Sequence, residues 1–233
     1  DDKRYLRQAI ALAINWEERN QVFHDGLCTI YDGMIPPGLD GYPQDGKIKG
    51  CYRGPDLERA RELLSKAGFP EGKRLPAIRH HMSQADPGPK MVEMTAQQLA
   101  EIGVKLKPQL DDFETFMDAV DNKDAMMFYF SWVSDYPDSE NNLALFYGPN
   151  ESPGNNYFNY QNDEFDKLYE QTLTMQPGPE RTAIYEKMRN IVIRDCPYIG
   201  SMGRVRQFLV NPELKNFKAT EVFHNWYKYL DVN

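Results

Sequence analysis

The apolar stretch Ala-Met-Met-Phe-Tyr-Phe at residues 125–130 decides the fold class of this chain. An unbroken apolar run of this length is typical of a strand buried on both faces, as in parallel sheets that helices cover on either side. The residues that follow, Ser-Trp-Val-Ser-Asp-Tyr-Pro-Asp at 131–138, contain a proline that ends the strand in a turn. We therefore expect a buried strand whose carboxyl end carries Trp132 and Asp135.

Strand and helix patterns alternate upstream of this run. Residues 77–82 and 104–110 predict two further strands, and apolar residues at helical spacing predict helices over 89–102 and 113–120. This β-α-β-α-β order indicates an α/β lobe in which helices flank a mixed β-sheet. Caps, breakers and apolar spacing predict further helices, over residues 3–24, from Asp56 to Gly68, from Asn162 to Leu173, and from Pro179 to just before Pro197.

Length and charge narrow the class of protein. At 233 residues the chain can form one large domain or two unequal ones, and its 41% hydrophobic content is that of a globular protein. The net charge of −8 would repel phosphate backbones and anionic lipids, so nucleic acid and membrane surfaces are not expected partners. No apolar run approaches the roughly 20 residues that cross a bilayer, and we expect the signal segment to be absent from this chain.

Three cysteines leave the disulfide state open. Cys28 and Cys51 flank a long loop rich in glycine and proline. A disulfide that closed this loop would contribute about 3 kcal/mol in an oxidising compartment. The alternative is three small buried thiols, with Cys196 as the third.

Motifs of known catalytic or metal chemistry are weak. The pattern Gly-x4-Gly-Lys at residues 41–47 lacks the Ser/Thr that would hold magnesium and the strand that should precede it, so no cofactor is expected. The adjacent histidines at 80–81 cannot present two ligands on one helical face, and no metal site is expected. The carboxylates Asp135, Asp138 and Glu140 leave a carboxylate-based hydrolase open as an alternative function.

The carboxyl end of the expected strand is the candidate binding site. Ligands of α/β sheets bind at the carboxyl ends of strands, where Trp132 would supply an aromatic wall and Asp135 a carboxylate suited to a cationic group. Ser134 and Tyr136 belong to the same segment and are further candidates. In the structural alternative, Trp132 is part of the core and Asp135 closes an Asx turn before Pro137.

Several ordered segments resemble the family 5 extracellular solute-binding proteins, the oligopeptide- and dipeptide-binding receptors of ABC importers. They span nearly the whole chain and lie at residues 6–15, 35–38, 56–70, 98–104, 131–138 and 159–166. The resemblance implies a two-lobed receptor in which residues 1–205 form the carboxy-terminal lobe and residues 206–233 return to an amino-terminal lobe absent from this chain. It also implies a monomer that is not an enzyme, that works in the periplasm or another extracytoplasmic compartment, and that delivers its solute to permease subunits. Such a location favours the disulfide between Cys28 and Cys51.

The resemblance also implies roles for single residues. Asp135 matches the position that binds the α-amino group of a peptide, and Trp132 matches an aromatic residue that lines the same pocket. The arginine that binds the ligand carboxylate in dipeptide receptors has no direct counterpart, because its position falls on Met82 and Arg79 is only near it. The expected ligand is therefore an oligopeptide or another small cationic solute.

Overall fold

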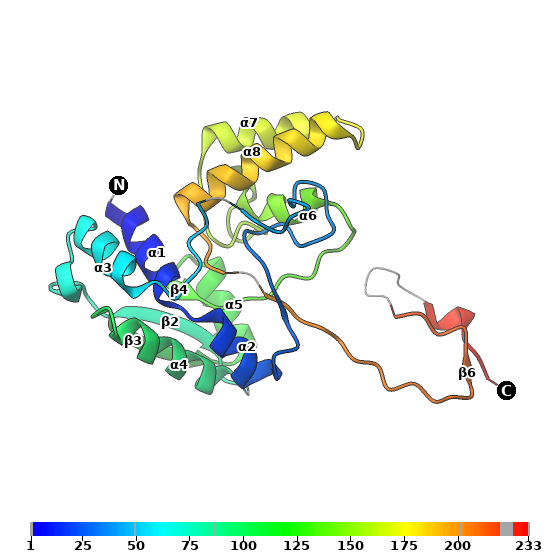
Figure 1. The fold of residues 1–233 in the computed structure, drawn as a ribbon, viewed down its shortest axis with the longest axis horizontal. Helices are drawn as coiled ribbons and strands as arrows, with labels where there is room; N and C mark the ends of the chain where they lie inside the picture. Colours follow the sequence, from blue (N-terminus) through cyan, green and yellow to red (C-terminus); the bar gives the residue numbers. More distant parts are fainter. Residues whose placement is uncertain (1, 49, 86, 201, 220–225, 233) are drawn as a thin grey trace.

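The computed structural model describes residues 2–48, 50–85, 87–200, 202–219 and 226–232. A three-stranded parallel sheet organises the first part of the molecule, with β2 (Ile78–Ser83) between β3 (Leu106–Asp111) and β4 (Met127–Phe128) (Figure 1). In this register Ile78 is paired with Leu106, and His80 with Met127.

Two helices connect the three strands. Helix α4 (Gly88–Ala100) joins β2 to β3, and α5 (Phe113–Asp121) joins β3 to β4. Strands that run parallel need such crossovers, because their ends lie at opposite edges of the sheet. The β-α-β-α-β order expected from the sequence is therefore confirmed.

The run at residues 125–130 differs from its prediction as a long buried strand. The strand β4 is only two residues long and lies at the edge of the sheet, both of its residues are partly exposed, and the Tyr129 backbone N–H adds one bond to the His81 carbonyl at 3.3 Å. Met126 is 63% exposed. The prediction of burial on both faces is wrong because one side of this segment lines an open cavity, described below, and is not covered by a helix.

Helices α1 (Asp2–Ala13) and α3 (Leu57–Lys66) pack against each other over the main core. The start and end of α3 agree with the sequence prediction. The side chain of Asp56 accepts a hydrogen bond from the Arg59 backbone N–H at 3.1 Å, and Gly68 adopts a left-handed φ of +87° just after the helix.

The predicted helix over residues 3–24 is in fact two helices. Helix α1 ends at Ala13, and α2 (Trp16–His24) begins after Asn15. The Asn15 side chain accepts a hydrogen bond from the Glu18 backbone N–H at 3.0 Å, so it serves as the N-cap of α2. The break changes the direction of the chain and places α2 beside α4, where Arg19 bonds to Thr95.

A second core lies in the part formed by the later helices. Its elements are α6 (Ser139–Leu143), the 3-10 turns η2 (Ala144–Phe146) and η3 (Gly148–Asn150), α7 (Asp163–Thr172) and α8 (Pro179–Asp195). Phe146 is buried at its centre and stacks on Phe158, with ring centroids 5.0 Å apart. Asn162 caps α7, and Pro179 is the first residue of α8, as predicted.

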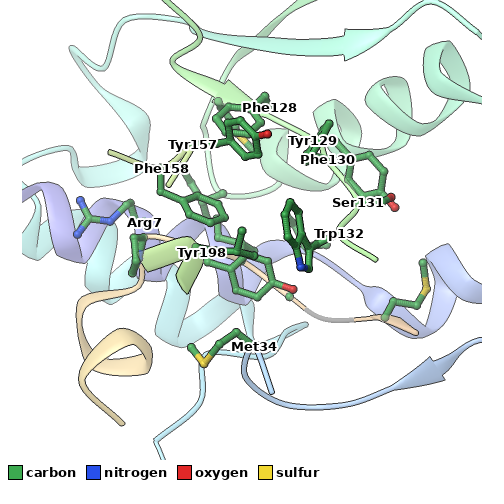
Figure 2. A pocket seen from close by; sticks show the side chains of 18 of the residues that line it. Arg7, Met34, Phe128, Tyr129, Phe130, Ser131, Trp132, Tyr157, Phe158 and Tyr198 are labelled. Carbon is green, nitrogen blue, oxygen red and sulfur yellow. The ribbon is translucent and has the colours of Figure 1, made fainter. Parts of the chain in front are cut away.

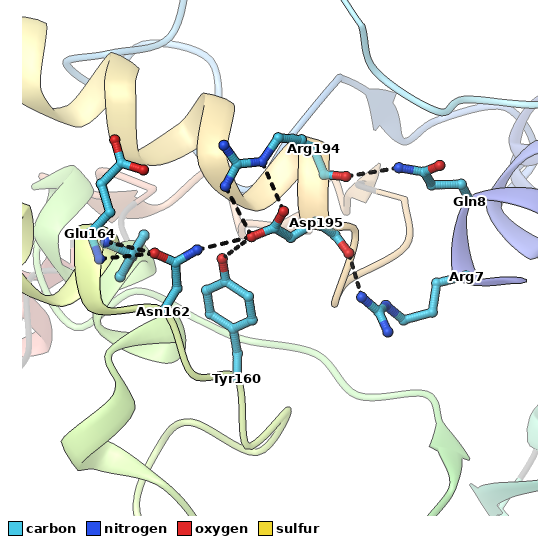
Figure 3. Close-up of polar contacts among 8 residues, drawn as sticks. Arg7, Gln8, Tyr160, Asn162, Glu164, Arg194 and Asp195 are labelled. Carbon is cyan, nitrogen blue, oxygen red and sulfur yellow. Dashed lines mark hydrogen bonds and ion pairs between the residues drawn. The ribbon is translucent and has the colours of Figure 1, made fainter. Parts of the chain in front are cut away.

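The carboxyl end of α8 joins the two parts (Figure 3). Arg7 of α1 donates hydrogen bonds to the carbonyls of Asp195 and Cys196, at 2.6 and 2.8 Å. The Asp195 carboxylate accepts hydrogen bonds from Tyr160 at 2.6 Å and from Asn162 at 3.0 Å. Burial raises the pKa of Asp195, but these bonds and its contact with the neighbouring arginine outweigh burial and hold the pKa below its usual value. The network fixes the first part against the second.

Short elements complete the fold. The 3-10 turn η1 (Pro70–Gly72) approaches the end of α4 so closely that a Cβ on Gly72 would lie 1.9 Å from the Gly103 carbonyl oxygen. Two-stranded antiparallel pairs form between β1 and β5 and between β6 and β7. The first pair consists of β1 (Thr29–Ile30) and β5 (Met202–Gly203), and the second of β6 (Leu214–Lys215) and β7 (Asp231–Val232). A further 3-10 turn, η4 (Trp226–Tyr229), precedes β7.

The last segment of the chain extends away from the rest of the molecule (Figure 1). It exposes apolar side chains, among them Leu209, which is fully exposed. Residues 220–225 and 233 of this segment lie outside the described residues. Among the residues that are described, no helix is long and apolar enough to span a membrane.

Candidate functional site

An open cavity of about 1300 Å³ lies between the two cores. Its walls are rich in aromatic rings, which Figure 2 shows around the hollow. These rings come from the segment after β4, from the loop before α7 and from the chain that leaves α8, namely Phe128, Tyr129, Phe130, Trp132, Tyr157, Phe158 and Tyr198. Concave, mainly apolar surfaces with a few polar groups are typical of ligand sites.

Two of the residues proposed from the sequence line this cavity. Trp132 donates a hydrogen bond from Nε1 to Asn141 Oδ1 at 2.8 Å. Ser134 donates from Oγ to Asn142 Oδ1 at 2.9 Å. Both asparagines are buried on α6, and they fix the orientation of the two side chains that face the cavity. Sequence reasoning missed both asparagines, although two adjacent amides on a short helix are a signal of buried polar contacts.

Asp135 lies next to these lining residues and is itself exposed. Its backbone N–H donates to Asn141 Oδ1 at 3.3 Å, and its carboxylate accepts a hydrogen bond from Asn141 Nδ2 at 3.2 Å. Asn141 therefore connects Trp132 with Asp135 and holds both in one arrangement. The carboxylate keeps accepting capacity for a cationic group.

The other two sequence candidates lie outside the cavity lining. Tyr136 is exposed and donates a hydrogen bond to the Glu140 carboxylate. Arg79 alternates to the exposed side of β2, where it donates to the Asp124 carbonyl at 3.2 Å. The structure therefore does not bring Arg79 together with Trp132 and Asp135, since successive residues of a strand point to opposite faces.

The carboxylates considered for a hydrolase have structural partners. Asp138 caps α6 and forms an ion pair with Arg181, and it also accepts a hydrogen bond from Tyr185. Burial raises the pKa of Asp138, but the backbone bond and the arginine outweigh burial, so the pKa is lowered overall. Glu140 accepts hydrogen bonds from two tyrosines. The structure gives no support to an acid and base pair here, and within the described part of the chain no cluster of potential ligands could hold a metal ion.

Basic residues dominate the charged lining of the cavity, which the sequence did not reveal. One acidic residue, Asp195, lines it, and its carboxylate already has partners. The basic residues in the lining come from α1, α2, the turn after α5 and the chain beyond β5, and they are Arg4, Arg7, Arg19, Lys123, Arg204 and Arg206. The potential inside the cavity therefore favours negatively charged groups.

All three cysteines are free thiols. Cys28 lies near Arg204, whereas Cys51 lies beside the backbone of Gly33. The expected disulfide between Cys28 and Cys51 is therefore not formed in the structure, because the loop between them does not bring its two ends together. Burial raises the pKa of Cys51 to about 11 and that of Cys196 to about 12.

The chain is similar in sequence to known proteins. Residues 1–154 match the family described as bacterial extracellular solute-binding proteins, family 5 middle. The chain is 26% identical over 222 residues to heme-binding protein A of Haemophilus influenzae, covering 93% of this chain and 39% of that protein. It is 30% identical over 208 residues to glutathione-binding protein GsiB of Escherichia coli, covering 85% of this chain and 39% of that protein.

Solved structures show the same fold. The periplasmic binding protein DppA of Helicobacter pylori, in complex with the peptide STSA, superposes with a TM-score of 0.80 at 23% identity, over 98% of this chain and 44% of that one. The fold is that of the periplasmic binding proteins. The chain belongs to family 5 of the bacterial extracellular solute-binding proteins, since the family match covers more than half of its residues. It spans about two fifths of the length of the curated relatives.

Proposed function

We propose that residues 1–205 form the carboxy-terminal lobe of a two-lobed receptor that binds peptides and delivers them to the permease of an ABC importer. Residues 206–233 would return to the amino-terminal lobe. The family of solute-binding proteins and the peptide held by the Helicobacter pylori neighbour support this function. The exposed apolar side chains beyond residue 206 support the return to a second lobe.

The network of Trp132, Asn141 and Asp135 is the observation that carries this proposal. Asn141 bonds both to Trp132, whose ring lines the cavity, and to Asp135, an exposed carboxylate with free accepting capacity next to the lining residues. When a second lobe closes over the site, Asp135 would form a charge-assisted hydrogen bond with the α-amino group of a peptide. Water would leave the cleft at the same step, which strengthens the bond.

Location, partners and the absence of catalysis are parts of the same proposal. The receptor would work in the periplasm or another extracytoplasmic compartment, as a monomer, and would return its solute chemically unchanged. Recovery of the bound peptides by mass spectrometry after long incubation tests the last point. Cleaved peptides would support a hydrolase instead.

The intact two-lobed protein tests the role of Asp135. We expect it to retain members of a mixed library of tripeptides and pentapeptides with free amino termini, and to retain the N-acetylated library poorly. Asp135→Asn should weaken the retention of free-amine peptides by about 1.5–3 kcal/mol, the range for a hydrogen bond to a charged group. Because the N-acetyl peptides lack the ammonium group, their retention should change little.

Asp118→Asn is the matched control. Asp118 is exposed on α5, outside the cavity lining, and its substitution removes the same charge. It should leave both libraries unchanged. If no peptide is retained by the unsubstituted protein, the proposed function is wrong; if Asp135→Asn weakens both libraries equally, Asp135 has only a structural role.

A further inference from the structure

Arg19 is a buried arginine that forms no ion pair with any carboxylate of the described chain. It lies on α2, is 3% exposed and lines the cavity. Its Nη1 donates a hydrogen bond to Thr95 Oγ1 at 3.0 Å, and its guanidinium lies over the rings of Trp16 and Tyr129, 5.5 and 4.9 Å from the ring centroids. The two rings and the threonine hold the group in one place. The phenol of Tyr129 is its other polar neighbour.

The unpaired atoms of Arg19 form one edge of its guanidinium. Nε and Nη2 are buried without a hydrogen-bond partner among the described residues, whereas Nη1 is occupied by Thr95. The N–H groups of Nε and Nη2 point in the same direction, and this edge matches the two oxygens of a carboxylate. Buried donors of a charged group are costly when they stay unpaired, so a partner is expected.

Two further buried polar atoms without partners accompany Arg19 in the cavity wall. Trp16 Nε1 and His80 Nδ1 have no hydrogen-bond partner in the described chain, and both residues line the cavity. The indole nitrogen can only donate. Burial, and next the charge of Arg19, lower the pKa of His80 to about 4, so its imidazole is neutral near pH 7 and does not add a second fixed charge.

The surroundings of Arg19 are also positive. Arg204 lies close enough to His24 to lower the pKa of that imidazole together with Arg19, after the larger effect of burial. Arg204 lines the cavity as well. The acidic residue nearest in sequence, Glu18, accepts a hydrogen bond from Gln98 at 2.8 Å. Asp25 acts on His24 in the opposite sense but does not line the cavity. Among the described lining residues, the α2 end of the cavity therefore offers paired donors and positive charge.

We propose that Arg19, with Trp16 beside it, binds a carboxylate group of the solute. The inference rests on the proposed function and makes it more specific: the peptide carries a carboxylate that reaches α2, while its amino group is bound at Asp135. A solute with a single cationic group would leave the guanidinium edge of Arg19 unpaired. The carboxylate can be the peptide terminus or an acidic side chain.

Four peptide libraries test this inference on the intact protein. One library has free carboxyl termini, the second is amidated at the carboxyl terminus, the third has free termini but lacks Asp and Glu, and the fourth is amidated and also lacks Asp and Glu. We expect amidation combined with the removal of Asp and Glu to weaken retention about tenfold or more, in line with the loss of one charge-assisted bidentate pair. Arg19→Met should remove this preference, and Arg19→Lys should keep part of it because the charge remains.

The third library separates the two sources of the carboxylate. If it binds like the complete library, the carboxyl terminus is the bound group; if it binds less well, acidic side chains contribute. Equal retention of peptides with and without any carboxylate by the unsubstituted protein would overturn the inference while leaving the proposed function intact. Failure to retain any peptide would instead contradict the proposed function.

Thermal unfolding of the unliganded protein provides a second readout. Arg19→Met removes a buried charge that has no carboxylate partner and keeps an unbranched apolar side chain over the two rings, so we expect a melting temperature that is unchanged or raised by about 2 °C or more. If a carboxylate of the other lobe pairs with Arg19, the same variant would lower the melting temperature and leave the preference among the libraries unchanged, which would overturn the inference. Arg61→Gln, an exposed arginine of α3 outside the cavity, is the control and should change neither readout.

Discussion

His80 shows how one buried side chain links the cavity to the stability of the fold. It is 3% exposed, and its neighbours Arg19 and His81 disfavour a further positive charge. Burial and these neighbours lower the pKa of His80 to about 4, whereas an unfolded chain has a histidine pKa of about 6.5. Between these values the unfolded state binds the proton and the folded state does not.

Acidification should therefore destabilise the protein through His80. The contribution of this group is fully present above pH 6.5, falls as the pH is lowered from about 6.5 to 4, and is constant below that. The loss would be at most about 3 kcal/mol of the free energy of unfolding. Urea titrations at several pH values, compared between the unsubstituted chain and His80→Gln, measure it.

His24→Gln provides the comparison for that experiment. Burial lowers the pKa of His24 too, but this residue is only partly buried. Its substitution should change the pH profile less than His80→Gln does. If the unsubstituted chain and His80→Gln lose stability in parallel between pH 7 and 4, His80 is accessible to protons in the folded state and the assignment of a buried neutral imidazole is wrong.

At the level of secondary-structure elements, the Phe146 ring is central to the packing of the second core. Phe146 is 1% exposed, stacks on Phe158, and meets the edges of Tyr160, Phe165 and Tyr198. Phe146→Ala should lower the free energy of unfolding by about 3–5 kcal/mol, because the transfer free energy is lost and a cavity remains. Phe113→Ala removes the same atoms from a ring that is 64% exposed and should change stability by about 0.5 kcal/mol or less.

Chemical denaturation of the two variants measures the difference. Similar losses for Phe146→Ala and Phe113→Ala would mean that the aromatic cluster is not a rigid core. Phe146 and Phe158 also line the cavity. A large loss for Phe146→Ala alone would therefore show that this part of the cavity wall belongs to the second core.

Element boundaries fixed by local chemistry could be predicted from the sequence. Asp56 and Asn162 accept hydrogen bonds from the backbone a few residues ahead, so a cap residue before an apolar pattern was a sufficient signal. Asn15 provides the same kind of signal, but the apolar period continues across it, and the break between α1 and α2 was missed. The run at 125–130 is apolar because it faces a cavity, and apolarity alone does not separate a cavity wall from a core.

The sequence predicted only those parts of the candidate site that lie in one local segment. Trp132 and Ser134 belong to the segment that the sequence singled out, and they do line the cavity. Arg19 was missed although it lies three residues after Trp16 and four before Phe23, on the apolar face of its helix. A charged residue on a buried face was the available signal; which residues surround it depends on long-range packing that a local pattern does not contain.

On the scale of the whole molecule, the cavity is open to solvent. Its lining comes from both cores of this chain, yet it stays open, and Asp135 is exposed beside it. The segment beyond residue 206 extends away from the rest of the molecule and exposes Phe208, Leu209 and Val210. Apolar side chains displayed in this way are typical of a surface that another part of a protein covers.

The isolated chain should therefore fold but bind peptides far more weakly than the two-lobed protein. Under the proposed function, the amino-terminal lobe would supply much of the surface that encloses the ligand, and its closure would remove water from the bonds at Asp135 and Arg19. Calorimetric titration with one peptide selected on the two-lobed protein measures both affinities, and a loss of about a hundredfold or more corresponds to at least 2.7 kcal/mol. Circular dichroism of the isolated chain checks that it is folded. Micromolar or tighter binding by this chain alone would mean that the open cavity is already a complete site, and that the second lobe serves only delivery to the permease.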